Sequence, residues 1–299
     1  MKIGFIGGGK MAQALARGLI SSGRYKAENI IASSPKVDNK LLEEIRKLGV
    51  ATTHDNVEVA NNSEVVFIAV KPLQVSKVVS EIAPIFRRDK LLVSIAMGIT
   101  MRYMETLLPS KSRVVRVMPN TPAVVGAGAS AYSLGAGCLD TDSGLVHDLL
   151  STVGFAVEVP EVLIDPVTGL SGSGPSYMFN AIEGLADGGV KMGLSRELSI
   201  KLAAYTLYGA AKMILETGDH PAVLKEAVQS PGGTSAYGMH ELEKGGFRGL
   251  LINAVEAASN RSKSTGDLVL PRQSMENMIY EDDHHEEFTS KRVAIAGRR

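Results

Sequence analysis

The residues of this sequence with the clearest chemical meaning form a glycine loop near its first residue. The loop reads Gly7-Gly8-Gly9-Lys10-Met11-Ala12 and has the spacing G-x-G-x-x-A. Gly7 permits a tight turn, Gly9 lets the backbone approach a pyrophosphate, and Ala12 lets the following helix pack close to a strand. The start of that helix presents free N–H groups that favour negative charge. We therefore expect a dinucleotide cofactor to contact Ile6, Gly7, Gly8, Gly9, Lys10 and Met11.

A second phosphate-binding motif overlaps this loop. Residues 4–11 also fit the pattern G-x-x-x-x-G-K, which binds nucleoside triphosphates when Ser or Thr follows the lysine and holds magnesium. Met11 stands at that position. Lys10 is therefore a poor triphosphate lysine, and the sequence argues against a kinase or an ATPase. We predict no metal site.

The segment at the end of the second predicted strand indicates which dinucleotide is bound. Enzymes that use NAD usually place Asp or Glu there, to accept a hydrogen bond from the ribose 2′-hydroxyl. Here the segment reads Ser33-Ser34-Pro35-Lys36 and contains no carboxylate. Ser34 can donate a hydrogen bond to a 2′-phosphate, and Lys36 can supply positive charge. The sequence favours NADPH and leaves NADH open as an alternative.

Further candidates for cofactor contacts follow other predicted strands. In an open α/β sheet, ligands bind outside the carboxyl ends of the strands. We expect the ribose and the nicotinamide to lie against such strand ends, and Asn56 to lie beneath the adenosine. The candidates at the strand ends are Ala69, Val70, Lys71, Pro72, Ala96, Met97 and Asn120.

These residues meet at one edge only if the strands before them form a parallel sheet. Short β-rich runs at residues 3–6, 30–32, 65–70, 91–95 and 114–118 alternate with helical patterns at 11–20, 41–48 and 75–82. Such alternation is typical of an α/β Rossmann-type doubly wound sheet. Runs at 130–133 and 156–159 extend the sheet, so we assign residues 1–160 to an NAD(P)-binding domain.

The second half of the sequence has a different character. Residues 177–192, 198–215 and 250–258 have the pattern of helices rich in Ala, Leu and Met. They are too apolar to face solvent on more than one side, which predicts an all-α domain over residues 161–263 that packs against a second subunit. The pattern dissolves from about Ser262, and we expect residues 264–299 to be a poorly ordered tail. We also expect removal of everything after Ser262 to leave activity largely intact.

Charge and cysteine usage exclude several classes of partner and compartment. Lys plus Arg number 32, as do Asp plus Glu, so the formal net charge is zero, which argues against nucleic acid or an anionic membrane as a partner. The single cysteine, Cys138, excludes an internal disulfide and fits a reducing compartment. We see no leader and no apolar stretch long enough to span a bilayer, and expect a cytoplasmic enzyme.

Five motifs, in order along the chain, are more specific than the glycine loop alone. They are Gly4-Phe5-Ile6-Gly7, Met118-Pro119-Asn120-Thr121-Pro122, the segment from Thr168 to Pro175, the segment from Ala186 to Gly193, and Ser230-Pro231-Gly232-Gly233-Thr234-Ser235. With residues 250–257 they closely resemble the pyrroline-5-carboxylate reductase family, from the first residues to about Ser262.

The resemblance implies the last step of proline biosynthesis. In that step a hydride passes from NAD(P)H to the C=N carbon of 1-pyrroline-5-carboxylate, giving L-proline. Members of the family have a Rossmann domain and a helical dimerisation domain, and their dimers often assemble into decamers, as a pentamer of dimers. The resemblance also implies that the active site lies where the nucleotide domain of one subunit meets the helical domain of its partner.

The resemblance assigns the substrate to the second half of the chain. A Gly-rich turn that opens a helix offers N–H groups and hydroxyls to a carboxylate, and the family pattern carries this role to Ser230, Gly233, Thr234 and Ser235. Relatives have threonine at the position of Ser235, so either Thr234 or Ser235 is the hydroxyl that assists proton delivery to the ring nitrogen. Glu161 matches an acidic position near the substrate ring, with a solvated surface role as the alternative.

Two other functions compete with the reductase. A β-hydroxyacid dehydrogenase of similar build would reduce a carbonyl, with Lys191 as the acid. A catalytically idle NADP-sensing module would act through its helical interface. The intact turn at residues 230–235 argues against the sensor.

Overall fold

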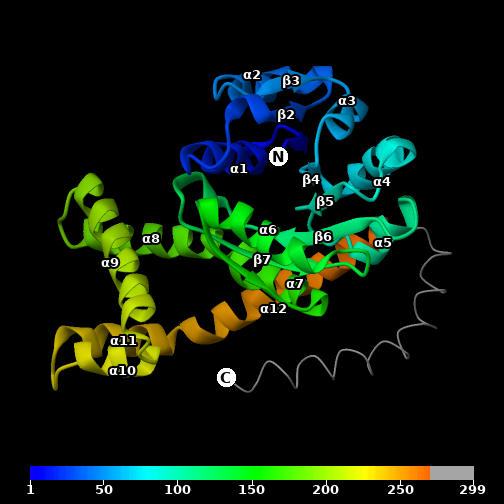
Figure 1. Ribbon diagram of the computed structural model, residues 1–299. Helices are drawn as coiled ribbons and strands as arrows, with labels where there is room; N and C mark the ends of the chain where they lie inside the picture. Colours follow the sequence, from blue (N-terminus) through cyan, green and yellow to red (C-terminus); the bar gives the residue numbers. More distant parts are fainter. Residues whose placement is uncertain (270–299) are drawn as a thin grey trace, which may run out of the picture. The chain divides into compact units, whose positions relative to one another are not determined.

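The computed structural model describes residues 1–269, which divide into two compact units. The first unit contains residues 1–168 together with 259–269, and the second contains residues 169–258. The first carries the sheet and the second is helical (Figure 1).

The sheet of the first unit has, among the described residues, eight strands in the order β3-β2-β1-β4-β5-β6-β7-β8. All neighbouring strands are parallel except β6 and β7. The strand order reverses its direction between β1 and β4, which is the crevice where doubly wound sheets bind dinucleotides. The strands are β1 (Ile3–Ile6), β2 (Ile30–Ser33), β3 (Ala51–Thr53), β4 (Val65–Ile68), β5 (Leu91–Ser94), β6 (Arg113–Met118), β7 (Gly128–Leu134) and β8 (Gly154–Glu158).

Helices cover both faces of this sheet, which explains why β4 is apolar at every position. Val65 and Phe67 join the core on the face of α1, α2 and α6, whereas Val66 and Ile68 join the core on the face of α3, α4 and α5. Successive residues of a strand point to opposite faces, so both sets are buried. The helices of this unit are α1 (Lys10–Ser21), α2 (Asn39–Arg46), α3 (Asn56–Asn61), α4 (Pro72–Ile82), α5 (Met101–Leu107), α6 (Asp140–Leu150) and α7 (Ile164–Val167).

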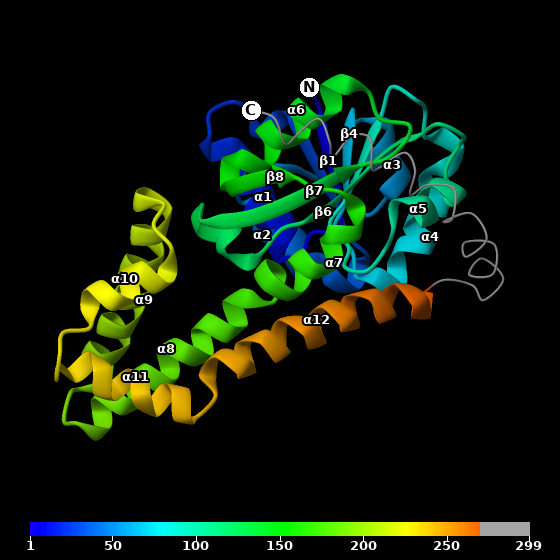
Figure 2. The same cartoon turned by 90° about the horizontal axis from the view of Figure 1, so that it is seen from below.

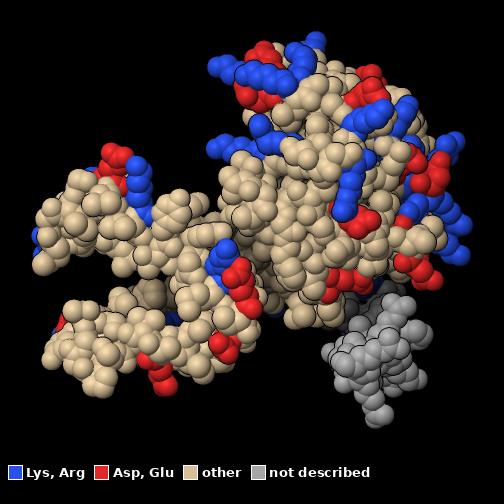
Figure 3. Space-filling view, turned by 60° about the vertical axis from the view of Figure 1, so that its left-hand side comes forward, with Lys and Arg blue, Asp and Glu red and all other residues tan. Residues whose placement is uncertain are grey.

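The helical unit buries little of its own apolar surface. It contains α8 (Gly174–Lys191), α9 (Arg196–Thr217), α10 (Pro221–Val228), α11 (Thr234–Lys244) and the first half of α12 (Phe247–Val269). Its buried apolar side chains are Ala186 and Ala203, while Tyr205 and Leu215 are 74% and 85% exposed. Figure 3 shows mostly uncharged surface over these helices. An exposed apolar area of this kind marks a surface that another protein chain covers.

The predicted parallel strands and long helices are confirmed, with ends that shift by a few residues except in α12, which runs from Phe247 to Val269 where residues 250–258 are predicted. Short elements are additional: β3, α3, α5, α6 and α10 have no counterpart in the sequence prediction. Residues 161–168, predicted to belong to the helical domain, pack with the sheet. Among residues 1–269 no helix is both long and apolar enough to cross a membrane.

One prediction about the chain beyond Ser262 is wrong. The helical pattern does not end there, because α12 continues to Val269 (Figure 2), and Ser262 is completely buried. Packing against the first unit outweighs the poor helix propensity of Ser264, Thr265 and Gly266. The rest of the predicted tail, residues 270–299, lies outside the described residues.

Candidate active site

The glycine loop has the backbone geometry that a pyrophosphate needs. Gly7 has a positive φ of 107°, and a β-carbon there would lie 2.5 Å from the carbonyl oxygen of Ala69. Gly9 precedes α1, which has no side-chain cap, and a β-carbon on Gly9 would meet nothing within 4 Å. Open space in front of an uncapped helix start fits an anionic group held by backbone N–H donors. The loop therefore fits the predicted cofactor.

Ser34 is buried and bonded to the glycine loop. Its Oγ accepts a hydrogen bond of 2.8 Å from the N–H of Gly8, and the residue is 4% exposed. Nδ1 of His54 lies 2.8 Å from the carbonyl oxygen of Ser34, a second contact that holds the segment. Ser34 thus shapes the loop itself, whereas Lys36, in a short 3₁₀ helix over Lys36–Asp38, is exposed.

Asn56 joins the end of β2 to α4. Its Oδ1 accepts a 2.7 Å bond from Oγ of Ser33, and its Nδ2 donates a 2.9 Å bond to Glu81. Asp55 caps the start of α3 by accepting bonds from the N–H groups of Val57 and Glu58, and so fixes the backbone of Asn56. The sequence pattern did not single out this cap or His54, although an Asp before a short polar helix is a usable signal.

The other candidates for cofactor contacts lie beyond the carboxyl ends of β4, β5 and β6. The N–H of Ala69 donates to the carbonyl oxygen of Ile6 at 2.8 Å, which joins the ends of β4 and β1. Lys71 is the residue before α4, with Pro72 in its first turn. Asn120 accepts a 2.8 Å bond from the N–H of Ala129. Since parallel strands end at the same edge of a sheet, these residues share the edge that the glycine loop occupies.

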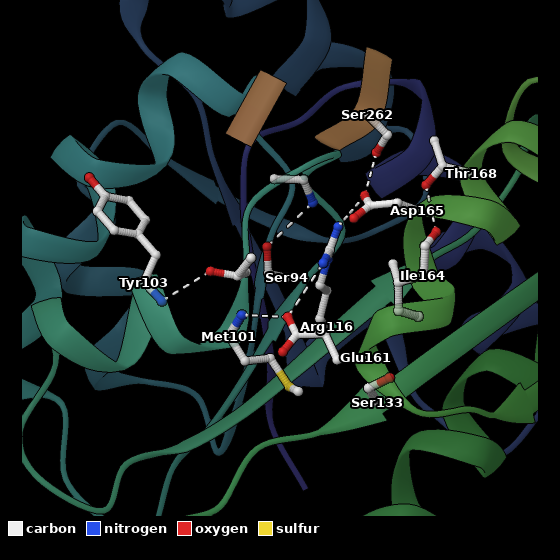
Figure 4. Close-up of polar contacts among 12 residues, drawn as sticks. Ser94, Met101, Tyr103, Arg116, Ser133, Glu161, Ile164, Asp165, Thr168 and Ser262 are labelled. Atoms are coloured by element: carbon white, nitrogen blue, oxygen red, sulfur yellow. Dashed lines mark hydrogen bonds and ion pairs between the residues drawn. The ribbon is translucent and has the colours of Figure 1, made fainter. Parts of the chain in front are cut away.

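Glu161 is part of a buried polar network and does not lie free in solvent (Figure 4). Its Oε1 accepts a 2.7 Å bond from the N–H of Met101 and lies 3.4 Å from Nη1 of Arg116. Arg116 also pairs with Asp165 at 2.7 Å, and Ser262 donates a 2.6 Å bond to the same carboxylate oxygen of Asp165. Glu161 is therefore only partly solvated, with 27% of its side chain exposed, and its role near the substrate ring stays a prediction. The sequence pattern missed Arg116, Asp165 and Ser262, because nothing local indicates a pairing over 97 residues.

The predicted substrate turn does open a helix. Gly233 stands before α11, its φ and ψ are extended, and no side chain caps the helix. The N–H of Gly233 donates to the carbonyl oxygen of Ser230 at 2.9 Å, and Oγ of Ser235 donates to that of Val228 at 3.0 Å. Thr234 is exposed. A backbone hydrogen bond closes the turn, and the N–H groups at the start of α11 have no side-chain cap. These N–H groups could therefore bind a carboxylate.

A cavity of about 870 Å³ in the first unit lies elsewhere. Its lining includes Lys111, which precedes β6, Arg113, which is the first residue of β6, and Gly137, which follows β7. It therefore lies toward the amino-terminal end of β6, away from the edge with the glycine loop. None of the predicted site residues lines it.

The single cysteine is unsuited to nucleophilic chemistry. Burial raises the pKa of the Cys138 thiol from its ordinary value of about 9 to about 11, and the Asp142 carboxylate contributes to the rise. The thiolate is the reactive form, so its fraction at neutral pH falls by about a hundredfold. We expect a thiol reagent to modify the native protein about a hundred times more slowly than the unfolded protein at pH 7.5. Equal rates, followed by absorbance, would contradict this burial.

Both the sheet-containing part and the helical part of the chain match models of known oxidoreductase families. Residues 161–265 match the family model for pyrroline-5-carboxylate reductase dimerisation, and residues 2–98 match that for coenzyme F420-dependent NADP oxidoreductases. The chain is 48% identical to human pyrroline-5-carboxylate reductase 2 over 266 residues, which cover 88% of this chain and 83% of the relative. It is 47% identical to pyrroline-5-carboxylate reductase of Arabidopsis thaliana over 262 residues, 88% of this chain and 94% of the relative.

Solved structures agree with these sequence relatives. A pyrroline carboxylate reductase of Plasmodium falciparum with NADP bound has a TM-score of 0.81 and 36% identity, covering 89% of this chain and 98% of that one. A pyrroline-5-carboxylate reductase of Coxiella burnetii has a TM-score of 0.80 and 38% identity, covering 88% and 98%. The similarity therefore includes the sheet edge with the glycine loop as well as the turn before α11.

Proposed function

The chain belongs to the pyrroline-5-carboxylate reductase family, and from this premise we propose that it reduces the C=N bond of 1-pyrroline-5-carboxylate to give L-proline, the last step of proline biosynthesis. The observation that carries the proposal is that both halves of such a site are intact in one chain. The glycine loop is open in front of α1, and the turn at residues 230–235 leaves the start of α11 without a side-chain cap.

NADPH is the cofactor that this chain favours, with NADH as a weaker substitute. When bound, it supplies the hydride that reduces the C=N carbon. The N–H groups of Gly9, Lys10 and Met11 hold the pyrophosphate, and Lys36 neutralises the 2′-phosphate. Two observations support this choice: the end of β2 lacks a carboxylate, and the Plasmodium relative has NADP bound.

The turn before α11 holds the carboxylate of the substrate without a cationic side chain. Ser230, Gly233, Thr234 and Ser235 offer N–H and hydroxyl donors to its two oxygens. Thr234 or Ser235 is the hydroxyl that contacts the ring nitrogen, where a proton has to be held during reduction. A protonated imine is already electrophilic, so its position relative to the nicotinamide supplies most of the acceleration. Glu161 remains a proposed contact near the ring.

The protein is an oligomer built through its dimerisation domain. We propose a dimer in which the sheet edge of one subunit and the turn of its partner form one active site, and a decamer made of five dimers. The exposed apolar side chains of residues 169–258 support the dimer, because the unit alone leaves them in water. We also propose that neither nucleic acid nor an anionic membrane is a partner, which the zero net charge supports, and that the protein is cytoplasmic, which its single cysteine supports.

An assay with purified protein distinguishes this function from its competitors. NADPH oxidation at 340 nm is expected with 1-pyrroline-5-carboxylate, together with formation of L-proline. Turnover of a 3-oxoacid instead would favour a β-hydroxyacid dehydrogenase that uses Lys191. Tight NADPH binding without turnover of either substrate would favour a sensor and contradict the reductase.

The role of Lys36 gives a test of cofactor preference. Lys36→Ala is expected to raise the KM for NADPH about fivefold and to leave that for NADH unchanged, since one charge-assisted contact to the 2′-phosphate contributes about 1 kcal/mol. Ser34→Ala is expected to raise both KM values, because Ser34 holds Gly8. Lys26→Ala is the matched control: Lys26 is exposed and precedes β2, at its opposite end. Equal effects of Lys36→Ala on the two cofactors would refute the assignment.

A further inference from the structure

Arg116 is the most deeply buried charged group of the network around Glu161. It lies on β6 with 2% of its side chain exposed, and it pairs with two carboxylates, Glu161 and Asp165. Its Nε has no hydrogen-bond partner among the described residues. Burying a guanidinium is costly unless it is paired, and removing one partner of a buried ion pair leaves an uncompensated charge. Both carboxylates lead to the same stretch of chain, the loop of residues 95–100 between β5 and α5 (Figure 4).

The first connection runs from Arg116 through Glu161 to the end of that loop. Glu161 accepts the N–H of Met101, the first residue of α5 and one of the N–H groups that a helix start leaves without an intrahelical partner. Thr100 caps the same helix by accepting the N–H of Tyr103 at 3.2 Å. Glu161 and Thr100 together define where the loop ends and α5 begins.

The second connection runs from Arg116 through Asp165 to the last turns of α12. Asp165 accepts a hydrogen bond from the hydroxyl of Ser262. The segment of α12 from Ser262 to Gly266 lies directly against Gly98. A β-carbon on Gly98 would lie 2.5 Å from the carbonyl oxygen of Ser262, and one on Gly266 would lie 2.3 Å from the carbonyl oxygen of Gly98. Gly98 has a positive φ of 76°. Backbone therefore packs on backbone, and a small shift of α12 displaces the loop.

Loss of Arg116 affects both connections at once. The guanidinium is the positive charge that lies between the carboxylates of Glu161 and Asp165. Without it, two partly buried negative charges face each other, and they separate, take up protons or admit water. Each of these three responses weakens the contacts that hold Met101 and Ser262 in their present positions. The loop at residues 95–100 then loses the restraints on both of its sides.

We propose that Arg116 is a positioning residue for the reduction, which fixes the loop of residues 95–100 through Glu161–Met101 on one side and Asp165–Ser262–Gly98 on the other. The inference rests on the proposed function, because Ala96 and Met97 of this loop are among the strand-end residues expected to contact the ribose and the nicotinamide of the cofactor. A displacement of about 1 Å between reacting atoms lowers a rate by about a hundredfold. Arg116 thus acts on catalysis without contacting the reactants.

This inference corrects the expectation that the chain beyond Ser262 is dispensable. Truncation after Ser262 removes Thr265 and Gly266, both of which lie against Gly98. We expect such a truncation to disturb the loop in the same way as loss of Arg116.

The test compares Arg116→Met with a matched variant on the same strand. Arg113 begins β6, is also mostly buried, and pairs with Asp142 at the opposite edge of the sheet. Arg116→Met is expected to lower kcat about thirtyfold or more, with the KM for NADPH changed less than about threefold. In the protein without NADPH, amide hydrogen exchange of residues 96–104 is expected to accelerate by about tenfold or more. Arg113→Met is expected to lower the melting temperature by about as much as Arg116→Met does. Its kcat is expected to stay within about threefold of the wild type, with no faster exchange at residues 96–104.

Milder variants keep the proposal open to test if Arg116→Met does not fold. Ser262→Ala is expected to accelerate exchange around Gly98 but not at Met101, and Glu161→Ala the reverse. Unchanged exchange at residues 96–104 in these variants and in Arg116→Met would overturn the proposal, as would equal losses of kcat in Arg116→Met and Arg113→Met. A wild-type protein that does not reduce the pyrroline would instead overturn the proposed function, and the exchange results would still show whether Arg116 holds the loop.

Discussion

Alanine at position 9 is expected to weaken NADPH binding by about a hundredfold while leaving the melting temperature of the cofactor-free protein almost unchanged. The β-carbon would stand in open space at the start of α1, so the fold tolerates it. The same space is where the pyrophosphate approaches the backbone, and a methyl group there removes contacts to a doubly charged group, each contributing about 1.5–3 kcal/mol. The dissociation constant for NADPH, measured by quenching of its fluorescence, checks the first expectation.

Gly7→Ala is the companion variant, because it is expected to destabilise the fold as well as weaken NADPH binding, whereas Gly9→Ala is expected to affect binding alone. Its β-carbon would lie 2.5 Å from the carbonyl oxygen of Ala69, and alanine is strained at a φ of 107°. We expect a loss of about 2–4 kcal/mol in the free energy of unfolding, in addition to weaker binding. If Gly9→Ala binds NADPH as the wild type does, the pyrophosphate does not lie against Gly9, and the assignment of the loop is wrong.

Removing both hydroxyls of the substrate turn is expected to lower kcat/KM for 1-pyrroline-5-carboxylate by about a hundredfold or more. A hydroxyl that donates to a charged group contributes about 1.5–3 kcal/mol, so Thr234→Ala combined with Ser235→Ala loses such a contact at Thr234 and, at Ser235, the bond to Val228 that shapes the turn. NADPH affinity is expected to stay within about twofold of the wild type, because its phosphates bind at the start of α1. Thr217→Ala, which removes a hydroxyl of the same unit outside the turn, serves as the control.

The single variants then decide which hydroxyl assists proton delivery. Ser235 donates to the carbonyl oxygen of Val228, so Ser235→Ala also loosens the turn and raises KM. The hydroxyl that contacts the ring nitrogen is the one whose loss lowers kcat itself, and Ser235→Thr is expected to keep full activity if that hydroxyl is Ser235. Wild-type kcat/KM in the double variant would show that neither hydroxyl belongs to the site.

The sequence predicts the parallel sheet well because burial on both faces leaves a strong pattern. Residues 65–68 are apolar at every position, and β1, β2 and β6 are followed directly by Gly7, Ser34 and Pro119. The short edge strand β3 leaves no such pattern, since none of its three residues is buried. α3 is equally hard to recognise, because it has six residues and depends on Asp55 for its cap.

The parts of the site that could not be predicted depend on contacts between distant segments. Arg116 lies in a run that reads as an apolar strand, and its partners come from residues 161, 165 and 262. α12 shows the same effect on a helix: Ser264, Thr265 and Gly266 favour its end, yet packing against Gly98 extends it to Val269. Local helix and strand propensities predict neither the pairing of Arg116 nor the length of α12, since contacts in the folded chain determine both. Ser34 was found by its position, but its bond to Gly8 emerges only in the folded chain.

The most direct test of the reductase assignment follows the hydride itself. Purified protein is supplied with 1-pyrroline-5-carboxylate and NADPH that carries deuterium at the transferred position, and the product is examined by mass spectrometry and NMR. The account predicts L-proline with one deuterium on Cδ, formed in a one-to-one ratio with the oxidised cofactor. Oxidation of the cofactor without deuterium in proline, or binding of both ligands without any proline, would contradict it.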